Sequence, residues 1–144
     1  MQEVWFFVVT DAQEHTLFYC TCEFLGKYAP LMNQLAEENW GQSWMRYATF
    51  TRKDYKSELH GHLGIDLKTL PEFRQRFEPA EGLRKLNFLR QLLLKNETAF
   101  VRNELVRPQD YEFLIVDLNT AIGAMEKATE LGEKWFLDVD VENE

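Results

Sequence analysis

Residues 108–141 have the sequence PQDYEFLIVDLNTAIGAMEKATELGEKWFLDVDV, in which two hydrophobic periods follow one another. In the first part, apolar side chains recur every three or four residues, which places them on one side of an α-helix. Pro108 just upstream, Asp110 with a carboxylate that can accept from free backbone amides, and Gly132 are typical helix-end residues. We therefore predict one long amphipathic helix with a buried stripe. The stripe consists of Tyr111, Leu114, Ile115, Leu118, Ile122 and Met125.

After Gly132 the hydrophobic period changes to two, as in a β-strand with one covered face. Four apolar residues alternate with Phe136 and three acids, and the pattern predicts a strand with one apolar face and one mostly acidic face. An alternative interpretation makes Phe113–Leu118 a buried strand, because periodicity alone does not exclude it for so short an apolar run. The helix-end signals favour the continuous helix. The alternating residues are Trp135, Leu137, Val139 and Val141 against Phe136, Asp138, Asp140 and Glu142.

The side of the predicted helix opposite the apolar stripe is rich in carboxylates. Lys127 is the one base of the helix, so the exposed face lacks the alternating charge pairs that stabilise solvated helices. Glu126 and Glu130 repel each other by a few tenths of a kcal/mol, and carboxylates near the helix end oppose the helix dipole. A partner surface would explain this cost; a solvated face that keeps the protein soluble is the alternative. The ridge consists of Glu112, Asn119, Glu126, Glu130 and Glu133.

The first third of the chain predicts a hairpin, a helix and another strand. Val4–Thr10 and Thr16–Phe24 are rich in aromatic and β-branched residues, which favours an antiparallel pair. A helix is expected to begin near Pro30 and to end at Gly41. Ser43–Thr51 alternates in the manner of a third strand whose two faces are both partly covered.

The middle of the chain is less regular. We interpret Arg52–Lys68 as loop and predict a short helix over Pro71–Phe77. A helical stripe then runs from Pro79 to Leu105, with a break near Asn96. The two carboxy-terminal helices are expected to form an αα-hairpin.

Together these elements predict one α+β domain over residues 1–144. About four antiparallel strands, in the element order β-β-α-β-α-α-β, would carry the helices on one face. A chain of 144 residues can bury a sufficient core without disulfides or metal. The apolar run Val4–Val9 is too short for a signal or membrane helix, so we expect a cytoplasmic protein with no membrane partner.

Charge is distributed unevenly along the chain. Residues 1–96 hold 12 acids and 12 bases, whereas residues 97–144 hold 12 acids and 4 bases, which accounts for the whole net charge of -8. An acidic protein of this kind is not suited to direct electrostatic binding of nucleic acid. A basic protein is the partner that the charge pattern favours.

The cysteines and histidines are the residues of the chain that could form a zinc site. Cys20, Cys22, His60 and His62 are residue types that hold zinc, but structural zinc sites usually have two to four residues between paired cysteines. A Cys-x-Cys pair on a strand is more typical of two buried reduced thiols. We therefore predict no metal and no cofactor.

Our leading functional hypothesis is a non-catalytic acidic protein of the immunity or antitoxin type, which neutralises a basic nuclease-type toxin by binding it. In its compact, acidic profile without catalytic motifs, the chain is similar to immunity proteins. One alternative is a metal-dependent hydrolase or nuclease that uses His60 and His62, and another is a phage-type inhibitor that mimics DNA. Partner contacts are expected from Glu112, Glu126, Glu130, Glu133, Phe136, Asp138 and Asp140, with Trp40 as a further aromatic anchor if exposed.

Overall fold

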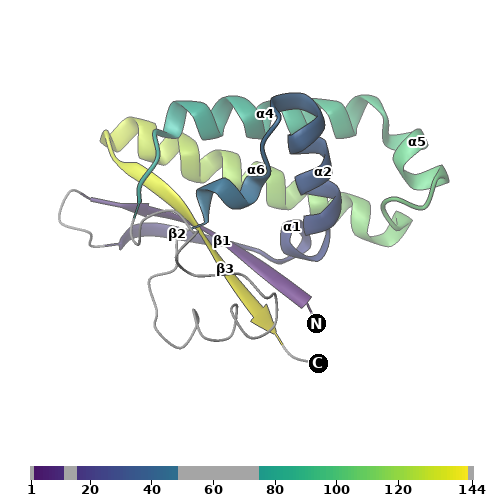
Figure 1. The fold of residues 1–144 in the computed structure, drawn as a ribbon, viewed down its shortest axis with the longest axis horizontal. Coiled ribbons are helices and arrows are strands. Elements are labelled where there is room, and N and C mark those ends of the chain that lie inside the picture. The colour runs from purple at the N-terminus through teal and green to yellow at the C-terminus, as the bar shows by residue number, and fades with distance from the viewer. Residues whose placement is uncertain (1, 12–15, 49–74, 143–144) are drawn as a thin grey trace.

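The computed structural model describes residues 2–11, 16–48 and 75–142, which form an α+β fold (Figure 1). The long helices α4 and α6 run side by side over the sheet. Among the described residues, no helix is long and apolar enough to cross a membrane. In chain order the elements are β1 (Gln2–Thr10), β2 (Thr16–Cys22), α1 (Glu23–Lys27), α2 (Ala29–Trp40), the 3-10 helix η1 (Trp44–Tyr47), α4 (Pro79–Lys95), α5 (Glu97–Arg102), α6 (Pro108–Leu131) and β3 (Lys134–Glu142).

β1 is the central strand of an antiparallel sheet with the order β2-β1-β3. In this register Phe7 lies opposite Cys20 of β2 and Leu137 of β3. Alternate side chains of β1 enter the main core, where Trp5, Phe7 and Val9 are completely or almost completely buried. The structure therefore confirms the α+β class, the amino-terminal antiparallel pair and the carboxy-terminal strand, although the second strand ends at Cys22 and Phe24 belongs to α1.

The predicted strand Ser43–Thr51 is not formed by the described residues of that segment. Residues 44–47 make a 3-10 helix instead, which begins where the Ser43 hydroxyl accepts the N–H of Met45 at 3.1 Å. Trp44 and Tyr47 are both buried, because residues three apart lie on the same side of such a helix. The sheet of the described residues has three strands, so the predicted fourth strand and the order β-β-α-β-α-α-β are not confirmed.

Helix α6 follows the predicted amphipathic pattern. Its stripe from Tyr111 to Met125 is buried, apart from the partly buried Ile115, because this side packs on the sheet and on α4. Residues 113–118 are helical, so the alternative strand at Phe113–Leu118 is wrong. Gly132 ends the helix at a φ of 69°, in the left-handed region where glycine has no steric penalty.

The other helices agree with the sequence in type and differ in detail. The helix expected near Pro30 begins at Ala29 and is preceded by the short α1. Asn96 separates α4 from α5 as predicted, and α4 pairs with α6 in the expected αα-hairpin. Leu105 follows the end of α5 and is exposed, so it does not belong to the buried stripe.

Part of the predicted middle of the chain can be compared with the structure. The loop at Arg52–Lys68 and residues 71–74 of the predicted helix lie outside the described residues. Residues 75–77 of that predicted helix are not helical. Phe77 instead forms an antiparallel bridge with Trp135, and its backbone N–H and C=O both bond to the β3 residue.

The Trp135 side chain joins the sheet to the helices. Its ring stacks on Phe7 with centroids 5.8 Å apart and lies 4.8 Å from the ring of Tyr47. The indole N–H donates to the Glu78 carbonyl at 3.1 Å, just before α4 begins. A Cβ atom placed on Gly82 would lie 2.8 Å from the indole ring, so α4 approaches Trp135 closely because this residue is glycine. One side chain thus fixes β3, β1, η1 and α4 together.

We predict opposite effects for alanine at two helical glycines. An added Cβ at Gly26 would lie 2.3 Å from the carbonyl oxygen of Glu3 in β1, and backbone cannot move aside as a flexible side chain could. Gly26→Ala should therefore lower the free energy of unfolding by about 2 kcal/mol or more. Gly123 in α6 has no atom within 4 Å of an added Cβ, so Gly123→Ala should raise it by roughly 0.5–1 kcal/mol.

Urea denaturation of the two variants and the native protein provides the measurement. Equal stability of Gly26→Ala and the native protein would contradict the close packing of α1 on β1.

Candidate functional site

Three carboxylates of the predicted partner surface lie on the exposed side of α6. Glu112, Glu126 and Glu130 are all exposed, and among the described residues none of them makes an ion pair. Glu126 and Glu130 are one turn apart, so their carboxylates repel each other. Glu112 is two heptads from Glu126, which corresponds to about 21 Å along the helix axis. Glu126 and Glu130 therefore form a local pair, and Glu112 stands apart.

The ridge expected along α6 is interrupted at its middle and at its end. Asn119 accepts a hydrogen bond from the Arg90 guanidinium of α4 at 2.8 Å, which brings a base between Glu112 and Glu126. Glu133 lies beyond the helix end at Gly132 and is partly buried. The continuous ridge from Glu112 to Glu133 is therefore wrong, because the packing of α4 and the helix end both divide it.

The strand residues of the predicted surface lie on the sheet rather than on the helix. Asp138 and Asp140 are partly buried, and their β1 neighbours in the register are Phe6 and Val4. Their side chains point to the face of the sheet opposite Leu137 and Val139, whereas α6 packs on the face that includes those residues. The helical and strand carboxylates do not form one surface.

Neither of the two predicted aromatic anchors is freely exposed. Phe136 is 5% exposed and lies beneath the Arg76 guanidinium, 4.2 Å from its ring centroid, so its ring is covered by Arg76. Trp40 is partly buried and packs edge to face against Trp44 and Phe88.

A buried charged network that the sequence analysis did not single out lies near Trp40. The Lys85 ammonium donates to the Tyr47 hydroxyl at 2.6 Å and to the Glu81 carboxylate at 3.0 Å, and Tyr47 donates to the same Glu81 oxygen at 2.7 Å. The ammonium also lies 5.4 Å from the centroid of a Trp40 ring. The four-residue spacing of Glu81 and Lys85 on α4 is the one sequence signal for this network.

The protonation states in this network follow from its contacts. Burial, followed by the hydrogen bond to Glu81, raises the pKa of Tyr47, so the phenol stays neutral and donates. Burial opposes ionisation of Glu81, but the hydrogen bonds from Tyr47 and Lys85 outweigh it and lower the pKa of that carboxyl. The network therefore holds a buried cation whose charge is balanced by an ionised carboxylate, which is the role of a structural ion pair.

Asp110 forms a second network between the start of α6 and the junction of α1 and α2. Its carboxylate accepts from the Tyr28 hydroxyl at 2.5 Å and from the Lys27 ammonium at 2.9 Å, and Tyr28 in turn accepts the N–H of Arg107. The expectation that Asp110 caps the first turn is wrong, because α6 begins earlier, at Pro108, and no side chain caps its first residue. Asp110 instead joins two distant parts of the chain.

Cys20 and Cys22 are free, buried and directed at α6. Cys22 contacts the carbonyl of Asp117 at 3.5 Å, and Cys20 contacts that of Thr120 at 3.8 Å. Interaction with Cys20 and burial raise the pKa of the Cys22 thiol, which disfavours the thiolate that a metal would need. Among the described residues there is no cluster of three metal-ligating side chains, and His60 and His62 lie outside them.

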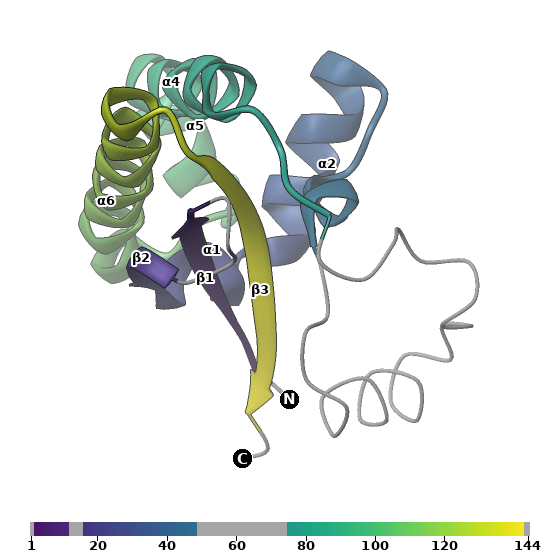
Figure 2. The ribbon, with the colours of Figure 1, turned by 90° about the vertical axis from the view of Figure 1, so that its left-hand side faces the viewer.

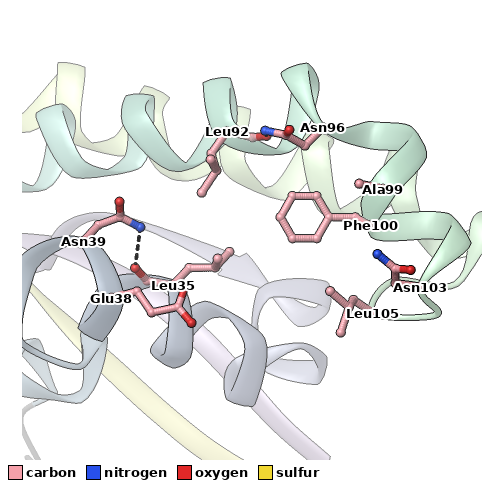
Figure 3. Close-up of a pocket in the computed structure, with 9 residues that line it drawn as sticks. All are labelled: Leu35, Glu38, Asn39, Leu92, Asn96, Ala99, Phe100, Asn103 and Leu105. Atoms are coloured by element: carbon pink, nitrogen blue, oxygen red, sulfur yellow. Dashed lines mark hydrogen bonds between the residues drawn. The ribbon is translucent and has the colours of Figure 1, made fainter.

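A pocket of about 380 Å³ lies between α2 and the corner of α4 and α5 (Figure 3). Leu92 and Phe100 supply apolar surface, while the amide groups of Asn39 and Asn96 donate to carbonyls of their own helices. Among its described lining residues, Glu38 is the one with an ionisable side chain. The pocket therefore provides no pair of groups for acid–base chemistry within that lining.

Comparison of the chain with protein-family models, with curated proteins and with solved structures gives no match. The function is therefore argued from the residues of the chain itself.

We predict a pH-dependent loss of stability when Asp110 is neutralised. Burial opposes its ionisation, yet the hydrogen bonds from Tyr28 and Lys27 lower the pKa of Asp110 below its ordinary value. A lowered folded-state pKa contributes stability that is present above the unfolded-state pKa and is lost as the pH falls through the folded-state pKa. Asp110→Asn should thus cost about 1–3 kcal/mol at neutral pH, and this difference should shrink as the pH falls below about 4.

Urea denaturation of both proteins across this pH range measures the difference. The exposed Glu97→Gln serves as a matched control that should match the native protein at every pH. A difference for Asp110→Asn that stays constant with pH would show that the charge of Asp110 is not its source.

Proposed function

We propose that the protein is a non-catalytic inhibitor of the immunity or antitoxin type, which binds a basic protein partner through the carboxy-terminal end of α6. The observation that carries the proposal is the pair Glu126 and Glu130, two exposed carboxylates that have no ion-pair partner among the described residues. Lysine or arginine side chains of a partner would neutralise both of them.

The position of this pair gives the proposal its physical support. Glu130 lies in the last turn of α6, where the helix dipole disfavours negative charge, and it also repels Glu126 one turn before it. Both effects destabilise the isolated protein, and a cation from a partner would relieve both. Electrostatic attraction of this kind mainly accelerates association with a basic partner.

An apolar contact next to the carboxylates would slow dissociation. Phe136 is covered and cannot serve, but Leu131, the last residue of α6, is exposed beside Glu130. Together Glu126, Glu130 and Leu131 form what we call the α6-end surface. Its two negative charges would attract a basic protein, and the bound protein would bury the aliphatic side chain of Leu131.

We predict that charge reversal at the α6-end surface removes the partner. The experiment captures proteins from the source cell on the purified protein and identifies them by mass spectrometry. A basic protein should be retained by the native chain and lost with Glu126→Lys/Glu130→Lys. The matched control, Glu97→Lys/Glu104→Lys, reverses two exposed carboxylates at and after α5 and should retain it. Equal retention by all three chains, or no charge-dependent partner at all, would refute the proposal.

We also predict that the same reversal stabilises the isolated protein. The two lysines repel each other as the two glutamates do, so the gain comes from placing cations near the negative end of the helix dipole and from lowering the net charge from -8 to -4. It should raise the free energy of unfolding by about 0.3–1 kcal/mol. Thermal and urea denaturation at low ionic strength measure the gain. A variant that loses the partner and also loses stability would instead indicate that the substitutions damage the fold.

A further inference from the structure

Among the described residues, one edge of the sheet is covered in part and the other has no strand or bridge beside it. Strand β3 has four charged residues, and its outer edge is bridged in part by Ala48 and Phe77. Strand β2, at the opposite edge, has the sequence TLFYCTC, without a charge, a proline or a glycine. Proteins prevent an edge strand from pairing with another chain by charges, prolines, β-bulges or a covering segment. β2 has no charge and no proline, and its pairing with β1 shifts register between Val9 and Thr10.

The backbone groups of β2 that point away from β1 can be assigned from the register. The backbone N–H and C=O of Trp135 bond to Phe77, on the side of β3 away from β1. Because successive residues of a strand bond to opposite sides, the backbone groups of Phe136 point toward Val8 of β1. The same alternation through β1 directs the N–H and C=O of Cys20 and Cys22 inward, to Phe7 and Trp5. It follows that Tyr19 and Thr21 direct their backbone N–H and C=O away from the sheet. Figure 2 shows β2 as the outermost strand on that side, with α6 above it.

Exposed apolar side chains gather along this edge. Tyr19 is 59% exposed and Leu17 is 47% exposed, with Phe18 between them on the other side of the strand. On the neighbouring α6, Phe113 and Val116 are 55% and 56% exposed. The thiol contacts of β2 to α6 carbonyls hold the helix against the strand. These five residues form what we call the β2-edge surface.

The area of the β2-edge surface suits an interface between two copies of the chain. Five large side chains that each expose about half of their surface present on the order of 500 Å² per copy, near the upper limit for patches on monomers. Full burial of these side chains in two copies would remove roughly 1,000 Å² in total, which is the lower limit for a specific interface, and the paired backbone would add to it. The five residues are uncharged, so the two surfaces match each other, whereas a basic partner would find no carboxylate among them.

We infer that the protein forms a two-fold symmetric dimer in which the β2 strands of two copies pair antiparallel and continue the sheets across the interface. Tyr19 is the middle residue of Thr16–Cys22, so a two-fold axis at Tyr19 places Thr21 opposite Leu17 of the other copy, where the pairing with β1 shifts register. The backbone groups of Tyr19 and Thr21 gain partners, and the Tyr19 rings meet beside Phe6, whose ring centroid is 6.1 Å away. The exposed residues of α6 flank the joined strands.

The ionic-strength dependence separates this association from the binding of a basic partner. Two chains that each have a net charge of -8 repel each other, and salt screens the repulsion. The dimer should therefore become tighter between about 0.1 M and about 0.5 M NaCl, while binding of a basic protein to the α6-end surface should weaken. If the dimer does not form, binding of a basic protein can still be tested, and if no basic protein binds, the dimer can still be tested.

Sedimentation velocity from low to high micromolar concentration tests the inference. The native protein should shift from one chain to two as concentration rises. Tyr19→Lys places two ammonium groups opposite each other at the axis and should raise the dimer Kd by about a hundredfold or more. Thr21→Pro removes an outward N–H but keeps the apolar side chains, and should also weaken the dimer; edge strands accept proline. Circular dichroism confirms that each variant is folded.

A matched control is Leu94→Lys, which introduces the same charge at an apolar residue of α4 that is 46% exposed and lies outside the β2-edge surface. It should leave the dimer Kd unchanged. A native protein that stays monomeric at every concentration and salt would overturn the inference. So would a dimer that Leu94→Lys weakens as much as Tyr19→Lys does, or one that both β2 variants leave intact.

Discussion

The packing of Trp135 is the constraint on which the rest of the structure depends. Its ring contacts Phe7 of the central strand and Tyr47 of η1, and its indole N–H holds the chain at the start of α4. Trp135 lies three residues after Gly132, the residue that ends α6. The packing of its ring therefore also sets the direction in which the chain leaves α6 and begins β3. A large aromatic side chain buried at the meeting of several elements provides apolar burial and specific geometry together.

This arrangement determines which charges remain available to a partner. Helix α4 must lie close to Trp135 and beside α6, which brings Arg90 to Asn119 and buries Lys85 against Tyr47 and Glu81. Carboxylates near α4 are thereby neutralised, as Glu81 is, while those at the end of α6 are not. Other exposed carboxylates, Glu97, Glu104 and Glu112, likewise have no ion pair among the described residues. What distinguishes the α6 end is that its two carboxylates are one turn apart and lie next to the exposed Leu131.

The two proposed interaction surfaces rely on different physics and occupy different parts of the molecule. The α6-end surface is acidic, and it would attract a basic protein through electrostatic forces that salt screens. The β2-edge surface is uncharged. In the proposed dimer its outward N–H and C=O groups would form hydrogen bonds with the second copy, and its exposed aromatic side chains would be buried. Both involve α6, which passes over β2 and ends near β3. A dimer through β2 would therefore present two α6 ends, and a partner with two basic sites would gain from both.

The sequence by itself determined the elements whose signals are local. The period of the α6 stripe, the glycines at positions 41 and 132, the alternation in β3 and the break near Asn96 all depend on neighbours within a few residues, so periodicity identified them. Tertiary structure decided what local patterns cannot contain. Trp44 and Tyr47 alternate like strand residues, yet both enter one core. Asp110 resembles a helix cap, yet distant Tyr28 and Lys27 bind it. Phe136 alternates outward, yet Arg76 covers it. The physical reason is the same in each case: periodicity gives the side of an element on which a residue lies, but burial and charge depend on which distant element meets that side.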